Sequence, residues 1–543
     1  MPRSERQRRQ RPPGSTSAEP HPDEPEPTDE DGIELRGRQN GEVRPVPQQA
    51  SASEAGRRSP FPARTTLLGL FGCSLVSLGA VGAGSIPVHD PLLSGTALTW
   101  VRFGHGKDLA TAVLYCGLAL VVWAWVRLGR MVHARQVHAR GVLAAVAAWT
   151  APLLLAPPLF SRDVYSYLGQ GNLALHGLDP YEVGPSALPG PLADNVGWLW
   201  QNTPAPYGPL FVLLAKGVVA VTGQGLVSGV ILMRLVMVTG LVLLCWSLPG
   251  LVRHLGGRTS VALWLTAANP LLLVHLVGGP HNDLLMVGLL GTGVLLVLDR
   301  RPVAGIAVVT LATAVKATAA VALPFLVWIW AKRVTGTPVN RFVKTTAAGL
   351  GVFTVTFAAC TVAAGVGLGW IGALSGSSAI VNWLSLPTAA GLLVHSAVDL
   401  FVTVDSAPFL AVGRTLGSLL LVVIAVRQWW AAREGGPDAL RRCALVLLAV
   451  AALSPATLPW YFSWALVLAA ALAWNLPALV TAALASVWLL LVTFPNGDTA
   501  LYSWGYLVGA LLASVLAAVS LVRPDPLGLS RSGTPADTGP AHH

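Results

Sequence analysis

Charged residues are scarce in this sequence of 543 residues: Asp, Glu, Lys and Arg make up 11% of it, and hydrophobic residues make up 53%. Soluble globular proteins contain about 25% charged residues. The scarcity excludes a single soluble enzyme of this length. The charges are also unevenly distributed, because residues 1–64 carry equal numbers of acidic and basic groups and the remainder carries the net charge of +10. A polytopic helical membrane protein shows this combination.

Several functional motifs are missing as well. The five cysteines show no CxxC or Cys/His spacing, so we expect neither a disulfide framework nor a metal site. The phosphate-binding motif of ATPases, a GxGxxG after a strand and the zinc-protease HExxH are also absent. These absences weigh against ATP-driven transport and a nucleotide-sugar domain, and we expect no cofactor. Basic residues stand singly or in pairs between apolar runs, which indicates membrane topology rather than binding of nucleic acid.

The chain divides into three parts. Residues 1–62 and 523–543 are polar and are expected to be disordered cytoplasmic tails. The first apolar run begins near Thr65, too late for a cleaved secretory signal. Residues 63–522 are expected to form one all-α, polytopic membrane domain.

Apolar runs predict the membrane crossings, since a crossing helix needs about 20 apolar residues. We expect about 13–16 transmembrane helices. The run 302–331 is too long for one helix and carries Lys316 at its middle, so it is predicted to split there into two short helices. The run 461–474 is short but needed for parity, and 208–223 is ambiguous. The other predicted crossings are residues 65–88, 108–128, 141–160, 226–252, 258–278, 283–299, 342–368, 408–428, 440–457, 476–494 and 500–521.

Arginines and lysines gather in alternate loops of this scheme, which places those loops and both termini in the cytoplasm. The carboxylates, which are the natural acid and base groups, then collect on the outer side. Two outer loops are long, at about 161–207 and 369–407, and both contain aromatic residues. We expect short interfacial helices in them, with the first loop catalytic and the second accessory.

A polar stretch directly after the third predicted crossing is the first candidate site. Asp163 stands there at a helix end on the outer surface, where a partly desolvated carboxylate can deprotonate a sugar hydroxyl. Arg162, Tyr165 and Tyr167 beside it, and His176 further on, suit a sugar-binding site. Alternatively, Asp163 only pairs with Arg162 or caps the helix.

A second candidate is the polar triplet His281, Asn282 and Asp283 at the outer start of a predicted helix. A helix N-terminus favours anions, and these residue types can hydrogen-bond a phosphate or a sugar, although they can also serve only as a cap. Lys316 is a cation inside an apolar run, which points to function by default and suits the phosphate of a lipid leaving group. Snorkelling of its amine to a headgroup is the alternative.

Aromatic residues complete the candidate site. Tyr207 lies at the end of the first outer loop, and Trp460 and Tyr461 follow a proline-interrupted helix end that faces outward. Such rings stack on sugar faces, and they also anchor helices at the membrane interface. Both interpretations stay open at this point.

These stretches resemble the actinobacterial MptA/MptB family of polyprenol-phosphomannose-dependent α-1,6-mannosyltransferases, which have the GT-C fold. The resemblance covers roughly residues 60–522, and its first run is the most specific. It rests on Arg162–Tyr167, His176–Tyr181, Tyr207–Leu210, His281–Asp283 and Pro455–Tyr461.

The resemblance implies transfer of mannose from β-linked mannosyl-phosphopolyprenol to the 6-hydroxyl of a mannose on a lipid-anchored mannan, in lipomannan or lipoarabinomannan synthesis at the cell membrane. An α-1,6 product implies inversion in one displacement, with Asp163 as the general base. His281 and Lys316 would stabilise the leaving polyprenyl phosphate. We expect a role closer to MptB, which resembles an enzyme for the proximal mannan, than to the elongating MptA.

Two alternatives are compatible with the same residues. A related GT-C enzyme could transfer another sugar, such as arabinofuranose, because sequence does not place the few hydrogen bonds that select the sugar. A transporter or flippase for a lipid-linked saccharide would share the aromatics and cations, but it predicts internal repeats, and none is clear between the two halves.

Overall fold

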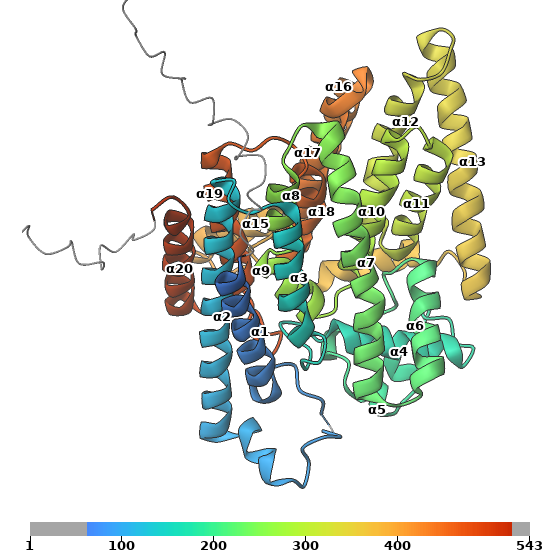
Figure 1. Cartoon of the computed structure of the whole chain (residues 1–543). Helices are drawn as coiled ribbons and strands as arrows, with labels where there is room; N and C mark the ends of the chain where they lie inside the picture. Colours follow the sequence, from blue (N-terminus) through green and yellow to red (C-terminus); the bar gives the residue numbers. More distant parts are fainter. Residues whose placement is uncertain (1–61, 89, 524–543) are drawn as a thin grey trace, which may run out of the picture. The chain divides into compact units, whose positions relative to one another are not determined.

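Helices form the framework of the described chain. The computed structural model describes residues 62–88 and 90–523, and in these ranges the regular secondary structure is helical apart from two isolated β-bridges. The predicted all-α polytopic class is therefore confirmed (Figure 1). The two predicted tails lie outside the described residues, except for Pro62 and Arg523.

The predicted crossings coincide closely with observed helices. Within the described part of the chain, six helices are long and apolar enough to cross a membrane, or seven if one bent pair counts as a single span. The six are α1 (Ala63–Ala83), α2 (Gly104–His133), α7 (Leu226–Leu255), α13 (Pro338–Ala364), α16 (Ala407–Ala431) and α20 (Trp504–Val522).

Shorter apolar helices account for most of the remaining predicted runs. Because an isolated crossing needs about 20 residues, the predicted total of 13–16 crossings depends on these shorter helices and stays a prediction. They are α3 (Ala139–Leu153), α6 (Pro209–Thr222), α10 (Asp283–Leu298), α11 (Pro302–Val315), the consecutive η5 (Ala317–Ala322) and α12 (Leu323–Ala331), and α19 (Leu476–Leu491).

The predicted break at Lys316 is confirmed. The helix α11 ends there, the backbone of Lys316 is extended with φ −149° and ψ 125°, and η5 and α12 follow. The run 258–278 is also interrupted, which the sequence analysis did not predict. It consists of α8 (Thr259–Leu265), α9 (Pro270–Leu272) and the π-helix η4 (Leu273–Gly278), with a bend of 45°. Pro270 explains this bend, because its nitrogen carries no hydrogen for a helical hydrogen bond.

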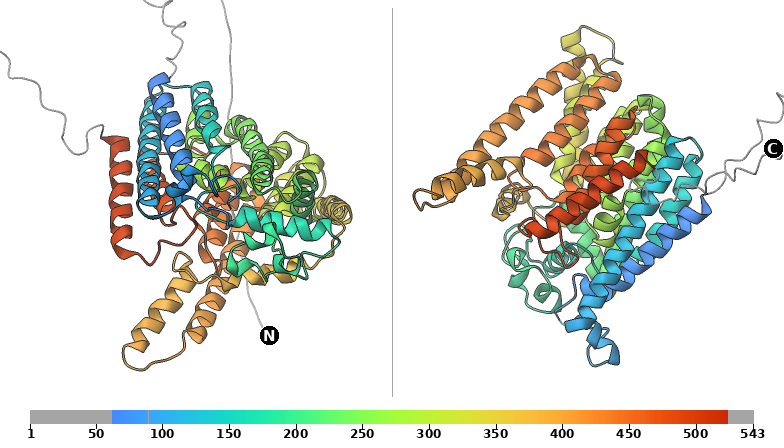
Figure 2. Two further views of the ribbon diagram at one scale, coloured as in Figure 1. Left: turned by 90° about the horizontal axis from the view of Figure 1, so that it is seen from below. Right: turned by 90° about the vertical axis from the view of Figure 1, so that its left-hand side faces the viewer.

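Short helices occupy both long loops, as predicted. The first loop contains α4 (Asp163–Leu175), η2 (Pro185–Ala187), α5 (Pro191–Asp194) and η3 (Trp198–Trp200). The second contains α14 (Trp370–Ala373), η6 (Leu374–Ala379) and α15 (Leu386–Asp399), and α15 packs against α16 as an antiparallel hairpin (Figure 2).

The C-terminal part of the chain adds further helices to the bundle. These are η7 (Ala432–Glu434), α17 (Gly436–Leu453), η8 (Pro459–Phe462) and α18 (Ser463–Ala469). The predicted crossing at 461–474 thus contains a helix of only seven residues.

The backbones of α7 and α10 lie in close contact. A Cβ added to Gly288 would lie 2.2 Å from the carbonyl oxygen of Gly240, so only glycine allows this approach. The buried guanidinium of Arg234 on α7 donates to the carbonyls of Leu154, Val277 and Gly278. These bonds tie α7 to the ends of α3 and η4, and they give an intramembrane cation a structural role.

Replacement of Gly288 by Val should separate α7 from α10. We expect the variant to lose about 1–3 kcal/mol of stability, the usual cost of overpacking, seen as a lower midpoint of thermal unfolding in detergent. The matched control is Gly509→Val on α20, where an added Cβ meets no atom within 4 Å. Equal midpoints for the two variants would contradict the close packing.

Candidate active site

A strained turn presents Asp163 at the start of α4. Phe160 has a φ of +59°, in the left-handed region that non-glycine residues rarely adopt. Its backbone nitrogen donates to the carbonyl of Pro495 at 2.8 Å, which holds the turn. The hydroxyl of Ser161 accepts a hydrogen bond from the backbone nitrogen of Asp163 at 3.0 Å. Strain of this kind gathers at functional sites, and here the turn precedes a carboxylate that lines a cavity.

His281 is the partner of this carboxylate. Its Nε2 lies 3.5 Å from Oδ2 of Asp163, and the side chain of His281 is 1% exposed against 23% for Asp163. The other ring nitrogen, Nδ1, lies 2.6 Å from the carbonyl oxygen of His275. A carbonyl can only accept, so Nδ1 carries a hydrogen. Nε2 makes no hydrogen bond within the described part of the chain, so its approach to Oδ2 of Asp163 is a close contact of 3.5 Å.

The surroundings lower the pKa of Asp163. Burial acts to raise the pKa, but the contact with His281 and its charge, the charge of Lys316 and the hydrogen bond with Ser161 outweigh burial and hold the pKa of this carboxyl below its usual value. The group is therefore ionised at neutral pH although it is largely enclosed. An ionised, partly exposed carboxylate beside a histidine can accept a proton from a bound hydroxyl.

Aromatic rings enclose this pair. The ring of Trp460 stacks on His281 with centroids 3.8 Å apart, which fixes the plane of the imidazole. Tyr167 packs edge-on against Tyr207 at 5.2 Å, and its hydroxyl accepts a hydrogen bond of 3.5 Å from the backbone nitrogen of Asn282. The amide side chain of Asn282 is fully buried, and neither its nitrogen nor its oxygen has a hydrogen-bond partner in the described part of the chain.

A buried ion pair forms the second half of the site. Nζ of Lys316 donates to both oxygens of Asp283, at 2.9 and 2.8 Å, and Nε1 of Trp464 donates to Oδ1 at 2.6 Å. Lys316 also lies 4.8 Å above the ring of Tyr461. Asp283 is completely buried, whereas Lys316 keeps 15% exposure. Asp283 is thus fully engaged and cannot act as a second free carboxylate.

A cavity of about 260 Å³ opens over Asp163. Its wall includes Trp460, Trp198, Trp200 and Asp498, so aromatic faces and a carboxylate surround the base. Trp198, Trp200 and Asp498 were not among the site residues predicted from the sequence. The aromatic content of the first long loop was a signal for the two tryptophans, but nothing marked Asp498, which reaches the cavity from the α19–α20 connection.

Two predicted site residues next to Asp163 serve the framework. The guanidinium of Arg162 donates to the backbone carbonyls of Ile86 and Asn195, although its side chain still lines the cavity. The hydroxyl of Tyr165 donates to the carbonyl of Ser85 at 2.8 Å. Tyr165 therefore turns away from Asp163.

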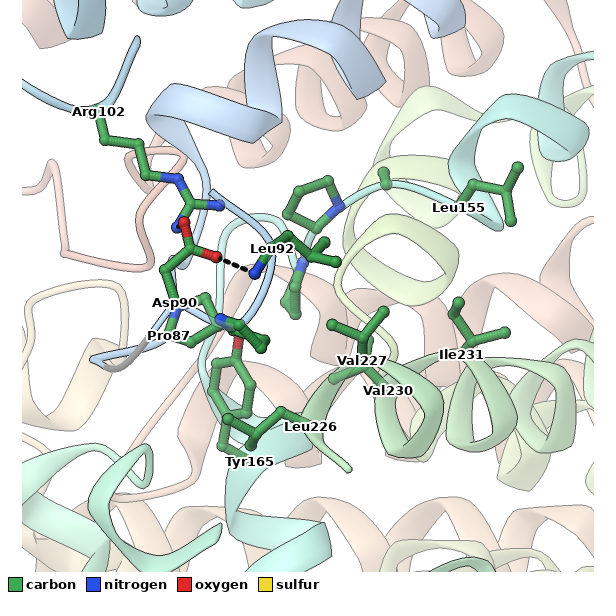
Figure 3. Close-up of a pocket in the computed structure, with 14 residues that line it drawn as sticks. Pro87, Asp90, Leu92, Arg102, Leu155, Tyr165, Leu226, Val227, Val230 and Ile231 are labelled. Atoms are coloured by element: carbon green, nitrogen blue, oxygen red, sulfur yellow. Dashed lines mark hydrogen bonds and ion pairs between the residues drawn. The ribbon is translucent and has the colours of Figure 1, made fainter. Parts of the chain in front are cut away.

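Tyr165 faces a separate cavity of about 70 Å³, shown in Figure 3. The ion pair of Asp90 and Arg102 and apolar residues of α7 line this cavity as well. It belongs to the packing of the first outer connection against α4 and α7 and has no contact with the pair of Asp163 and His281.

His176 lies at the other end of α4. It is exposed, and its Nδ1 contacts the carbonyl of Asn172 at 2.9 Å. Thirteen residues separate it from Asp163, about 20 Å along an α-helix, so the structure does not bring the two together. Among the described residues, no group of three or more His, Cys, Asp or Glu side chains is placed to hold a metal ion.

Comparisons with known proteins agree with one another. Residues 66–332 match the family model described as alpha-(1→6)-mannopyranosyltransferase, N-terminal domain, and residues 387–523 match that of the MptB C-terminal domain. No solved structure matches the chain.

The curated relatives cover most of the chain. Alpha-(1→6)-mannopyranosyltransferase A of Mycobacterium tuberculosis is 43% identical over 88% of this chain and 93% of its own length. The protein named A in Corynebacterium glutamicum is 33% identical over 82% and 96%. The protein named B in the same organism is 29% identical over 74% and 71%. Identity to the A-type relatives thus exceeds identity to this B-type relative.

The ion pair of Asp283 and Lys316 should show strong thermodynamic coupling. Lys316→Met leaves a buried carboxylate without its cation and should cost about 3–5 kcal/mol, measured as loss of thermal stability in detergent. The double variant Lys316→Met with Asp283→Asn removes the unpaired charge and should recover part of this loss. Simple addition of the two single effects would show that the pair is not coupled.

Proposed function

Because the chain belongs to the MptA/MptB family of alpha-(1→6)-mannopyranosyltransferases, we propose that it moves mannose from a polyprenyl-phosphomannose donor to the 6-hydroxyl of a lipid-anchored mannoside. The observation that carries this proposal is the ionised Asp163, paired with His281 and open to a cavity walled by tryptophans. The basic loops favour an active site on the outer face of the membrane, with both termini in the cytoplasm.

The proposed reaction is a single displacement. The acceptor 6-oxygen attacks the anomeric carbon of the β-linked mannose, and the bond from that carbon to the phosphate oxygen breaks. The hydroxyl proton passes to Asp163, and the electron pair of the broken bond leaves with polyprenyl phosphate. Configuration inverts to α, and no covalent sugar on a second carboxylate is needed. The engagement of Asp283 with Lys316 and Trp464 supports this one-carboxylate scheme.

His281 has a different role from the one predicted. His281 was expected to contact the leaving phosphate, but its Nε2 faces Asp163 and its Nδ1 donates to the carbonyl of His275. We therefore assign His281 to positioning and charge-stabilising the base. We assign the leaving phosphate to Lys316, which retains some exposure, and to Asn282, whose amide has no hydrogen-bond partner among the residues that the structure describes. A buried amide without a partner is costly unless a ligand satisfies it.

The cavity over Asp163 suits the acceptor. Trp460, Trp198 and Trp200 present aromatic surface to it, and such surface packs well on the apolar faces of sugar rings. Higher identity to A-type relatives favours an A-like role in elongating the mannan. This A-like assignment replaces the role closer to MptB that was expected from the sequence alone.

Removal of the base should abolish transfer without unfolding the protein. We expect Asp163→Asn to reduce transfer from synthetic polyprenyl-phosphomannose to an α-1,6-mannoside by about 100-fold or more, measured in membranes at matched expression. The control is Asp179→Asn, beyond the far end of α4, which should keep near-normal activity. Full activity of Asp163→Asn, or loss in the control alone, would place the base elsewhere.

The pH dependence should report the link between Asp163 and His281. Since the folded protein lowers the pKa of Asp163, the base stays ionised until the pH falls below the usual carboxyl range, and activity should decline only there. Burial raises the pKa of Asp163, and His281 is the main group that lowers it. In His281→Phe the pKa of Asp163 should therefore rise, and the acid limb of the kcat/KM profile should move up by about one pH unit or more. The control His176→Phe should leave the limb in place. An unmoved limb in His281→Phe would refute the coupling.

A further inference from the structure

The connection between α19 and α20 brings a second carboxylate to the cavity over Asp163. Asp498 lies on this connection, is exposed, and lines the cavity together with Trp198 and Trp200 of η3. The proposed displacement needs one carboxylate only, and Asp163 supplies it. Asp498 is therefore a polar group of the same cavity that the chemistry at the anomeric carbon does not use.

A tight turn fixes the position of Asp498. Its backbone carbonyl accepts a hydrogen bond of 2.8 Å from the nitrogen of Phe494, and its backbone nitrogen donates to Oδ1 of Asn496 at 3.2 Å. Nδ2 of Asn496 donates to Oδ2 of Asp498 at 2.6 Å. A carboxylate offers about four acceptor sites, so this bond orients the group and leaves most of its acceptor sites open to a ligand.

The turn of Asp498 packs directly against the turn that presents the base. The carbonyl of Pro495 accepts the hydrogen bond from the backbone nitrogen of Phe160. Gly497 has a φ of +97°, and a Cβ added to it would lie 3.2 Å from Cα of Ser161. Two adjoining turns, held together through their backbones, thus carry the two carboxylates of this cavity.

Exposure increases from one end of the cavity to the other. Trp460 is 4% exposed, the side chain of Asp163 is 23% exposed, and Trp198 is 83% exposed. Asp498 is exposed as well, so it belongs to the open end with Trp198. A saccharide whose terminal 6-hydroxyl lies at Asp163 has to leave through this open end, and its next sugar therefore passes Asp498.

We propose that Asp498 binds two neighbouring ring hydroxyls of the second mannose of the acceptor and thereby selects an acceptor that ends in an α-1,6-linked pair of mannoses. This inference deepens the proposed function and rests on it. An α-1,6 linkage leaves the 2-, 3- and 4-hydroxyls of the second mannose free, and a carboxylate accepts hydrogen bonds from two such donors at once. The exposed ring of Trp198 offers the same sugar a stacking surface.

Replacement of Asp498 should weaken the preference for the longer acceptor. Transfer from synthetic polyprenyl-phosphomannose is measured with methyl α-mannoside and with methyl α-1,6-mannobioside. The wild type should favour the mannobioside in kcat/KM, and Asp498→Ala should reduce this advantage about tenfold through KM, the effect of losing a hydrogen bond to a charged group. In Asp498→Asn an amide oxygen can still accept from Asn496, so the turn is kept and a smaller loss of the same preference is expected.

The matched control is Asp405→Ala. Asp405 is also exposed and also stabilises a turn, because its Oδ1 accepts a hydrogen bond of 3.1 Å from the backbone nitrogen of Ala407, but it does not line the cavity. This variant should keep the wild-type preference. An equal fall of kcat with both acceptors in Asp498→Ala would show that the residue only supports the turn beside Asp163. Either that result or an unchanged preference would overturn the proposal.

A binding measurement without donor separates this inference from the proposed function. The dissociation constants of the two methyl glycosides are measured by calorimetry on the full chain in detergent. Tighter binding of the mannobioside that Asp498→Ala loses supports the subsite even if the wild type transfers no mannose from polyprenyl-phosphomannose. Equal binding of the two glycosides by the wild type, or an unchanged difference in Asp498→Ala, refutes the subsite even if transfer is observed.

Discussion

The contact between the carboxylate of Asp163 and the imidazole of His281 joins two parts of the chain that are far apart in sequence. Each side is held by backbone: a left-handed turn at Phe160 presents the aspartate, and the carbonyl of His275 fixes the ring of the histidine. Trp460, from a third segment, stacks on that ring. Burial acts to raise the pKa of Asp163, but the contact with His281, together with Lys316 and Ser161, outweighs it and keeps the carboxyl ionised in a largely enclosed place. The proposed chemistry depends on this ionised carboxylate.

Helix breaks bring these groups together. In lipid, backbone polar groups must be satisfied within the protein, so a break is tolerated only where it is buried in protein or lines a cavity. The helices are interrupted after α3, after η4, at Lys316 and after α17. These four interruptions contain or are directly followed by Asp163, His281, Lys316 and Trp460, respectively.

Much of this arrangement could be predicted from the sequence, since it depends on local patterns. Apolar runs located the helices, and Lys316 inside a long run located its break. Long-range partners could not be predicted: nothing in the order of residues shows that Lys316 meets Asp283, or that His281 turns to Asp163 rather than to phosphate. Trp464 was missed, although its spacing of three residues from Tyr461 places both on one helix face. His176 was predicted as a site residue because of its neighbours in sequence, but it lies at the opposite end of α4 from Asp163.

The central claim is that Asp163 acts as a base in one displacement. A single turnover with excess enzyme, β-mannosyl-phosphopolyprenol and an α-1,6-mannoside acceptor, quenched at successive times and followed by intact-protein mass spectrometry, tests it most directly. Our account predicts that α-linked product accumulates while the protein never gains the mass of a mannosyl group. A mannose covalently attached to Asp163 during turnover would contradict it, because the carboxylate would then be a nucleophile and not a base.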